Sequence, residues 1–252
     1  MSLFRTVNLE VILPVESYGD KVQAAQKPKF FKTLYLLNGF GGNQEDWLDY
    51  SLLRNLAEKN NLAIVLPAGE NSFYEDQAGT GGQHGELVGK ELVEFTRRIL
   101  PLSTNREDTY IGGLSMGGFG ALLLGSKYYR TFSKIFSLSG AFIIDDIANQ
   151  GASYTDQIAD YSFYKRTFGD LSKVRDSEKD PLFWVKKECA AGIIPNVYQA
   201  VGKNDFLIEE NRTMHAKLTN LKVNLTYNED KGIHDWNFWN AYLPNAINWL
   251  LA

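Results

Sequence analysis

The 252-residue sequence contains little cysteine, little histidine and no large excess of charge. A single cysteine, Cys189, excludes an internal disulfide bond and a cysteine-based zinc site. No neighbouring residue would activate this thiol, so we expect it to be structural. The formal net charge of −4 gives no electrostatic basis for binding nucleic acid or an anionic membrane. The three histidines are scattered along the chain, so we expect no metal site.

Long apolar runs are absent as well, since no stretch approaches the length of a transmembrane helix. The first six residues lack the basic region and apolar core of a secretory signal, so we expect a cytoplasmic protein. Hydrophobic residues make up 44% of the chain and charged residues 22%, which is ordinary for a globular protein. The length predicts one domain over residues 1–252.

Short apolar segments alternate with segments of helical periodicity. Strands are predicted over residues 7–13, 33–37, 62–67, 108–112, 134–138, 196–202 and 223–227, with 7–13 alternating as an edge strand does. Helices are predicted over residues 46–58, 86–100, 119–128, 211–221 and 236–251, and the polar stretch 21–29 predicts a loop. The alternation indicates an α/β fold in which helices cover both faces of a mainly parallel sheet. Ligands of such sheets bind beyond the carboxyl ends of the strands.

Residues 141–181 interrupt this alternation. The stretch is longer than an ordinary connection and rich in aromatic residues. Long connections in compact domains are often lids, so one interpretation is a lid insertion. The alternative is an ordinary pair of helices that covers the sheet.

The most specific motif is Gly113-Leu-Ser-Met-Gly117, which lies between a predicted strand and a predicted helix. This context is that of a nucleophile elbow, where a tight turn lifts a serine above the sheet edge. The glycines are needed because a Cβ at either flank would clash in so tight a turn. Ser115 is therefore the candidate nucleophile, and the alternative is a glycine-rich turn of another α/β protein.

A serine hydroxyl is a poor nucleophile and needs a base. His234 lies between the last predicted strand and the last predicted helix, where an α/β-hydrolase places its base. His215 falls within a predicted helix and is expected to be solvated, while His84 falls in a glycine-rich stretch that predicts a flexible loop. These positions favour His234.

The base needs an acid to fix its tautomer and stabilise the imidazolium ion. Asp205 directly follows the predicted strand 196–202, as such an acid should. Glu209 and Glu210 are its rivals, although they are expected to begin the next helix, and Asp235 adjoins the base but should point elsewhere. The resulting chain order of serine, acid and histidine is that of the α/β-hydrolases.

A tetrahedral intermediate also needs N–H donors aimed at its oxyanion. One is expected from the backbone of Met116, and the other from the glycine-rich loop after strand 33–37. We choose the N–H of Phe40 there, with Gly41 as the next candidate. The loop lacks the sequence of a phosphate-binding P-loop.

Five motifs in this order resemble the esterase D family of α/β-hydrolases, known as the putative-esterase family, and most of all its bacterial tributyrin-esterase branch. They are Tyr35-Leu-Leu-Asn-Gly-Phe-Gly-Gly-Asn43 with Trp47, Leu66-Pro-Ala-Gly-Glu-Asn-Ser-Phe-Tyr74, Gly113-Leu-Ser-Met-Gly-Gly-Phe-Gly-Ala121, Gly202-Lys-Asn-Asp-Phe-Leu207 and Gly232-Ile-His-Asp-Trp236. The resemblance covers nearly the whole chain. It implies an α/β-hydrolase fold, no metal or organic cofactor, and hydrolysis of short acyl esters.

The chain departs from the family at two positions. Asn38 stands where many relatives have histidine, and Glu75 stands where relatives commonly carry tryptophan. Relatives are often dimers or tetramers, which leaves a homo-oligomer open here.

The sequence thus predicts a serine carboxylesterase that acts on a small-molecule ester through an acyl-enzyme. Large rings at the expected strand ends should leave a small apolar pocket, formed by Phe40, Gly41, Phe73, Phe142, Phe206 and Trp236. The alternatives that share this chemistry are a feruloyl or acetylxylan esterase and an S-formylglutathione thioesterase. A catalytically silent binding module on the same fold is the alternative from another class.

Overall fold

The computed structural model describes residues 2–14, 29–77 and 81–252, and within these ranges seven strands form one sheet. The strand order is β1-β3-β2-β4-β5-β6-β7, with β1 antiparallel to β3 at one edge and every other neighbouring pair parallel. The strands are β1 (Leu9–Ile12), β2 (Lys32–Leu37), β3 (Leu62–Pro67), β4 (Thr109–Leu114), β5 (Lys134–Leu138), β6 (Asn196–Gly202) and β7 (Asn224–Asp230). The predicted α/β architecture and the edge position of β1 are confirmed.

The apolar runs of the sequence correspond to the middle of this sheet. Every residue of β3 and β4 is buried, and in β2 only Lys32 is exposed. A parallel strand has helices on both faces, so it needs apolar side chains on both. The edge strand β7 is only half-buried along most of its length.

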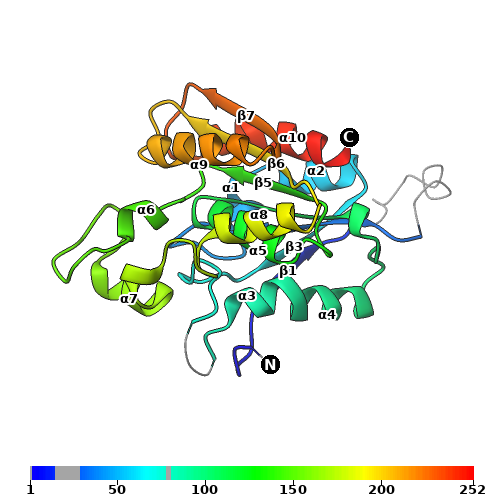
Figure 1. The fold of residues 1–252 in the computed structure, drawn as a ribbon. Helices are drawn as coiled ribbons and strands as arrows, with labels where there is room; N and C mark the ends of the chain where they lie inside the picture. The colour runs from blue at the N-terminus through cyan, green and yellow to red at the C-terminus, as the bar shows by residue number, and fades with distance from the viewer. Residues whose placement is uncertain (1, 15–28, 78–80) are drawn as a thin grey trace.

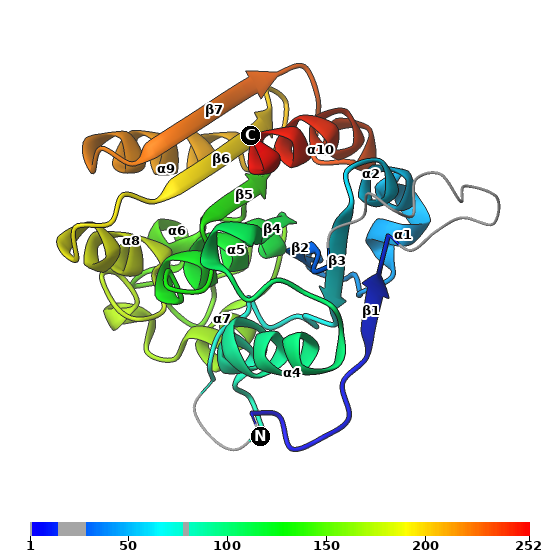
Figure 2. The same cartoon turned by 90° about the vertical axis from the view of Figure 1, so that its right-hand side faces the viewer.

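Helices cover both faces of the sheet (Figure 2). One face packs against α1 (Asp46–Tyr50), α2 (Leu53–Lys59) and α10 (Trp236–Leu251). The other face packs against the π-helical turn η2 (Leu87–Glu91), α4 (Leu92–Ile99), α5 (Met116–Lys127) and α9 (Ile208–Asn220). The short helix α3 (His84–Glu86) leads into η2, and α8 (Pro181–Ala190) lies on α5. All residues of α5 from Met116 to Ser126 are buried, as expected for a helix enclosed between the sheet and another helix.

The helix predicted over 46–58 is wrong as one continuous element. It breaks into α1 and α2 at Ser51, whose backbone is extended. The Ser51 hydroxyl accepts a hydrogen bond from the N–H of Leu53 at 3.2 Å and donates to the carbonyl of Trp47 at 2.5 Å. The apolar spacing in the sequence continues across this break, so periodicity alone predicts one helix. It carries no information on hydrogen bonds between a serine side chain and the nearby backbone.

Other boundaries differ by a few residues. The helix predicted over 211–221 begins at Ile208, and the strand predicted over 223–227 continues to Asp230. The helix predicted over 86–100 is interrupted by η2, and a short 3₁₀ turn, η3 (Arg106–Asp108), precedes β4. The loop predicted over 21–29 lies, apart from Lys29, outside the described residues.

The segment 141–181 leaves the sheet after β5 and returns at α8. It contains α6 (Ile144–Ile147), α7 (Tyr161–Phe168) and the 3₁₀ turn η4 (Leu171–Lys173). Figure 1 shows α6 and α7 together at the left of the molecule, beyond the sheet. Whether this segment acts as a lid stays a prediction.

Candidate active site

The turn from β4 into α5 has the geometry that the Gly-x-Ser-x-Gly motif predicts. Ser115 adopts φ 53° and ψ −119°, a strained conformation for a residue with a side chain. A Cβ on Gly113 would lie 2.5 Å from the backbone of Gly117, and a Cβ on Gly117 would lie 2.4 Å from the carbonyl oxygen of Leu37. Glycine is therefore required on both sides of the serine.

Three side chains from distant parts of the chain form one line of hydrogen bonds. The Oγ atom of Ser115 lies 3.0 Å from Nε2 of His234, and Nδ1 of the same ring lies 2.9 and 3.0 Å from the two carboxylate oxygens of Asp205. The carboxylate favours the tautomer with a proton on Nδ1, which leaves Nε2 free to accept the serine proton. Ser115 is 8% exposed and Asp205 2% exposed, so both ends of the line are buried, while the His234 side chain between them is 17% exposed.

Two of the three rival acids, Glu209 and Asp235, have other partners. Glu209 pairs with Arg212 at 2.7 Å on the exposed side of α9. Glu210 lies in the first turn of that helix, as expected. Asp235 accepts the N–H of Phe238 at 3.0 Å and so caps α10.

The other two histidines lie elsewhere. His215 lies within α9, as predicted, and stacks on Tyr227 with ring centroids 4.1 Å apart. The prediction that His84 lies in a flexible loop is wrong, because His84 begins α3 and is only 5% exposed. Its backbone N–H donates to the carbonyl oxygen of Glu75 at 3.3 Å, a contact that no local sequence pattern predicts.

The loop after β2 runs beside the serine, since a Cβ on Gly39 would lie 3.6 Å from Cβ of Ser115. The N–H of Gly41 donates to Oδ1 of Asn71 at 2.7 Å and is therefore occupied. Among the described residues, nothing accepts a hydrogen bond from the N–H of Phe40. Met116 is the first residue of α5, so its N–H has no partner within the helix. The N–H groups of Phe40 and Met116, which the sequence predicts as oxyanion donors, are therefore both available.

Aromatic rings surround these groups on two sides. Phe206 lies 4.7 Å from the ring of His234 and is 42% exposed, while the edge of Trp239 contacts the same histidine at 5.1 Å. Trp236 packs between Trp47 and Trp239, so Trp239 lies between it and His234.

On the side of the oxyanion donors, Phe40 contacts Phe73 at 6.2 Å and Phe163 of α7 at 5.2 Å. Phe73 is completely buried, and Phe142 is 6% exposed. Sequence reasoning did not place Phe163 in this wall. The density of aromatic residues in 141–181 was the signal that could have found it.

A cavity of about 270 Å³ opens beside Phe206. Its wall includes Ile143, Tyr154 and Ile158 together with the acidic residues Asp146, Asp156 and Glu210. Burial, and then neighbouring carboxylates, raise the pKa of Asp146. Burial is also the main reason that the pKa of Glu210 is raised.

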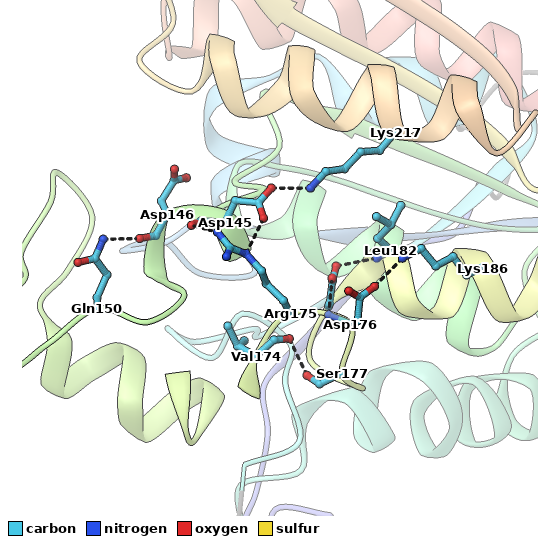
Figure 3. A network of polar contacts seen from close by, with 11 residues as sticks. Asp145, Asp146, Gln150, Val174, Arg175, Asp176, Ser177, Leu182, Lys186 and Lys217 are labelled. Atoms are coloured by element: carbon cyan, nitrogen blue, oxygen red, sulfur yellow. Dashed lines mark hydrogen bonds and ion pairs between the residues drawn. The ribbon is translucent and has the colours of Figure 1, made fainter. Parts of the chain in front are cut away.

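Ion pairs join the inserted segment to α9 and to the segment that follows β3. Asp145 of α6 accepts from Nε of Arg175 at 2.9 Å and pairs with Lys217 of α9 (Figure 3). Lys179 pairs with the buried carboxyl group of Glu75 at 3.2 Å, on the segment that follows β3. The insertion is thereby joined both to α9 and to the loops beside the oxyanion donors.

Among the residues that the structure describes, no three histidine, cysteine or acidic side chains lie close enough together to bind a metal ion. In the same part of the chain, no helix is long and apolar enough to cross a membrane.

A family model described as "Putative esterase" matches residues 2–250. The chain belongs to this esterase family. Over 249 residues it is 44% identical to an acetyl esterase of Caldicellulosiruptor saccharolyticus, which covers 98% of this chain and 94% of the relative. The chain is thus a carboxylic ester hydrolase, as the sequence predicted.

Solved structures agree with this assignment. The esterase is similar to the fluorophosphonate-binding serine hydrolase FphF of Staphylococcus aureus, with a TM-score of 0.84 and 26% identity over 100% of this chain and 94% of that one. It is also similar to the S-formylglutathione hydrolase FrmB of the same organism, with a TM-score of 0.80 and 28% identity over 98% and 93% of the two chains. These neighbours confirm the α/β-hydrolase fold.

Proposed function

We propose that this esterase hydrolyses short-chain acyl esters through an acyl-enzyme on Ser115. The observation that carries the proposal is the line of hydrogen bonds from Ser115 through His234 to Asp205, next to the free N–H groups of Phe40 and Met116. A nucleophile, a base, an orienting acid and two oxyanion donors are the parts that acyl transfer requires.

The reaction proceeds in two halves. Nε2 of His234 takes the proton of Ser115 while Oγ attacks the ester carbonyl carbon, and the N–H groups of Phe40 and Met116 bind the resulting oxyanion. When the intermediate collapses, the bond to the alcohol oxygen breaks and His234 returns the proton to that oxygen. In the second half His234 takes a proton from water, whose oxygen attacks the acyl carbon. The bond from that carbon to Oγ of Ser115 then breaks, His234 returns the proton to Oγ, and the acid is released.

The arrangement of the rings supports a short acyl group. The alcohol must leave next to His234, because that residue protonates it, and the carbonyl oxygen binds the oxyanion donors. We therefore place the acyl chain on the side away from His234, against the ring of Phe40. There Phe40, Phe73 and Phe163 contact one another and close the space. An acetyl esterase is also among the relatives.

The cavity beside Phe206 lies on the alcohol side, since Phe206 contacts His234. Its carboxyl groups disfavour an anionic leaving group by charge repulsion. Glutathione carries net negative charge at neutral pH, so this cavity supports an uncharged alcohol rather than S-formylglutathione. A comparison of kcat/KM for S-formylglutathione with that for an uncharged acetate ester tests this choice.

The proposal as a whole is tested with Ser115→Ala. The variant should lose reaction with a fluorophosphonate probe and at least about 10⁴-fold in kcat on p-nitrophenyl acetate. Ser126→Ala is the control, because Ser126 is a buried serine at the other end of the same helix. Full turnover by a folded Ser115→Ala protein would overturn the proposal.

A further inference from the structure

The segment that follows β3 contacts the loop of Phe40 on both sides of that residue. Before Phe40, the hydroxyl of Tyr74 lies 3.1 Å from both the carbonyl oxygen and Oδ1 of Asn38, and donates to Asn38. After Phe40, Oδ1 of Asn71 accepts the N–H of Gly41 at 2.7 Å. The backbone that carries the Phe40 N–H is therefore held at positions −2 and +1 by a separate segment.

The same segment reaches the second oxyanion donor. The N–H of Phe73 lies 3.3 Å from Sδ of Met116. Asn71, Phe73 and Tyr74 of one short segment therefore contact residues at both donors. Phe73 contacts Met116 itself, and the other two contact neighbours of Phe40.

Tyr74 occupies its place at a conformational cost. Phe73 and Tyr74 have φ angles of 52° and 57°, in the left-handed region that bulky residues avoid. A Cβ on Gly69 would lie 2.1 Å from the Tyr74 hydroxyl, and a Cβ on Gly120 of α5 would lie 2.3 Å from its ring. The ring is therefore enclosed between two glycines, and the tertiary structure maintains the strained backbone.

The bonding of Asn38 leaves it little freedom. Asn38 is 1% exposed, and its Oδ1 also accepts the N–H of Gly69 at 2.9 Å. Tyr74 is completely buried, and burial raises the pKa of its phenol well above the ordinary value. The hydroxyl is therefore protonated and a donor at neutral pH.

We propose that Tyr74 and Asn71 are positioning residues that hold the Phe40 N–H at the angle and distance the oxyanion requires. The inference rests on the proposed function, in which Phe40 supplies that donor. Neither side chain needs to touch the substrate, because each acts through a neighbour of Phe40. Oxyanion stabilisation depends on donors that are fixed before the reaction, so a small displacement of one N–H is expensive.

Two single substitutions test the proposal. Tyr74→Phe removes only the hydroxyl bound to Asn38, and Asn71→Ala removes only the acceptor of Gly41. Each should lower kcat on p-nitrophenyl acetate by about 10- to 100-fold, with KM changed by less than about 3-fold. A trifluoromethyl ketone forms an oxyanion on the serine, so its inhibition constant should rise by the same factor as kcat falls.

Tyr35→Phe is the matched control. Tyr35 is 1% exposed and its hydroxyl bonds Thr96 at 2.8 Å, away from the oxyanion loop. It should lose stability comparable to that of Tyr74→Phe while keeping kcat and the inhibition constant. A purely structural role for Tyr74 predicts that the two variants behave alike in all three measurements.

The outcomes separate this inference from the proposed function. If Ser115→Ala is inactive but Tyr74→Phe and Asn71→Ala keep kcat within about 2-fold, the positioning role is overturned and the function stands. The role is also overturned if kcat falls while affinity for the trifluoromethyl ketone is unchanged. Activity retained in Ser115→Ala would overturn the function and the inference together.

Discussion

The carboxylate of Asp205 accepts the ring Nδ1–H of His234 at 2.9 Å and, through Oδ1, also the backbone N–H of Leu207 at 2.9 Å. The second bond comes from the turn that leads into α9, so the local backbone fixes the direction of the carboxylate. The carboxylate is thus oriented independently of His234. A carboxylate in a fixed direction in turn holds the histidine in the tautomer with the proton on Nδ1.

Asp205→Asn should lower kcat by about 10²- to 10⁴-fold, because an amide no longer stabilises the imidazolium ion. Glu209→Gln should change it by less than about 3-fold, since Glu209 pairs with Arg212 on the exposed side of α9. Steady-state kinetics on p-nitrophenyl acetate compare the two variants. The opposite ranking would mean that the acid has been assigned to the wrong residue.

The acyl preference should be narrow. Each methylene that fits adds up to about 0.8 kcal/mol of binding, whereas one forced against a packed aromatic wall costs about 1–3 kcal/mol. The value of kcat/KM for p-nitrophenyl esters should therefore be highest between acetate and butyrate and fall steeply at octanoate. A maximum at octanoate or palmitate would indicate an open channel, and would contradict the closed wall formed by Phe40, Phe73 and Phe163.

Gly117→Ala should destabilise the protein strongly. The new Cβ would lie 2.4 Å from the carbonyl oxygen of Leu37 and 2.7 Å from that of Asn38, and neither backbone group can move cheaply. We expect a loss of about 3 kcal/mol and a fall in Tm of roughly 6–12 °C. Gly151→Ala is the control, because nothing lies within 4 Å of a Cβ at that exposed position. Equal Tm values for the two variants would contradict the packing described at the elbow.

Glu188 should make stability depend on pH. Burial raises the pKa of this carboxyl group on α8 to about 7, against opposing effects of Ser126 and Arg106. A pKa raised in the folded state means that the group favours folding when protonated, so its contribution is lost as pH rises from about 4.5 to about 7. Glu188→Gln resembles the protonated form and should gain Tm relative to the parent protein between pH 5 and pH 8.

The comparison needs an exposed control, for which Glu58→Gln on α2 is suitable. Differential scanning calorimetry of the three proteins at the two pH values separates the effect of Glu188 from that of other groups. A difference between Glu188→Gln and the parent that does not change with pH would show that the carboxyl group is not penalised by burial.

The sequence predicts most strongly where local rules and chain order agree. The elbow follows from glycines that the tight turn requires, and the central strands follow from apolar runs buried on both faces. The order of Ser115, Asp205 and His234 led to side chains that the structure brings within hydrogen-bonding distance.

What the sequence did not predict depends on contacts between distant segments. The bond between Asn71 and Gly41 joins positions 30 residues apart, and that between Tyr74 and Asn38 joins positions 36 apart. No periodicity or motif in the sequence predicts either hydrogen bond. The break at Ser51 was missed for a different reason, because one side-chain hydroxyl overrides a continuous apolar pattern.

The ion pairs of the inserted segment restrict how it could open. A rigid flap hinged at both ends would pull Lys179 away from Glu75 and leave a buried carboxyl group without its partner, at a cost of about 1–5 kcal/mol depending on protonation. It would also part Asp145 from Lys217 on α9. Asp176 of the segment also pairs with Lys186 of α8. Any movement that kept these ion pairs would be confined to the span between Asp145 and Asp176, which carries Phe163.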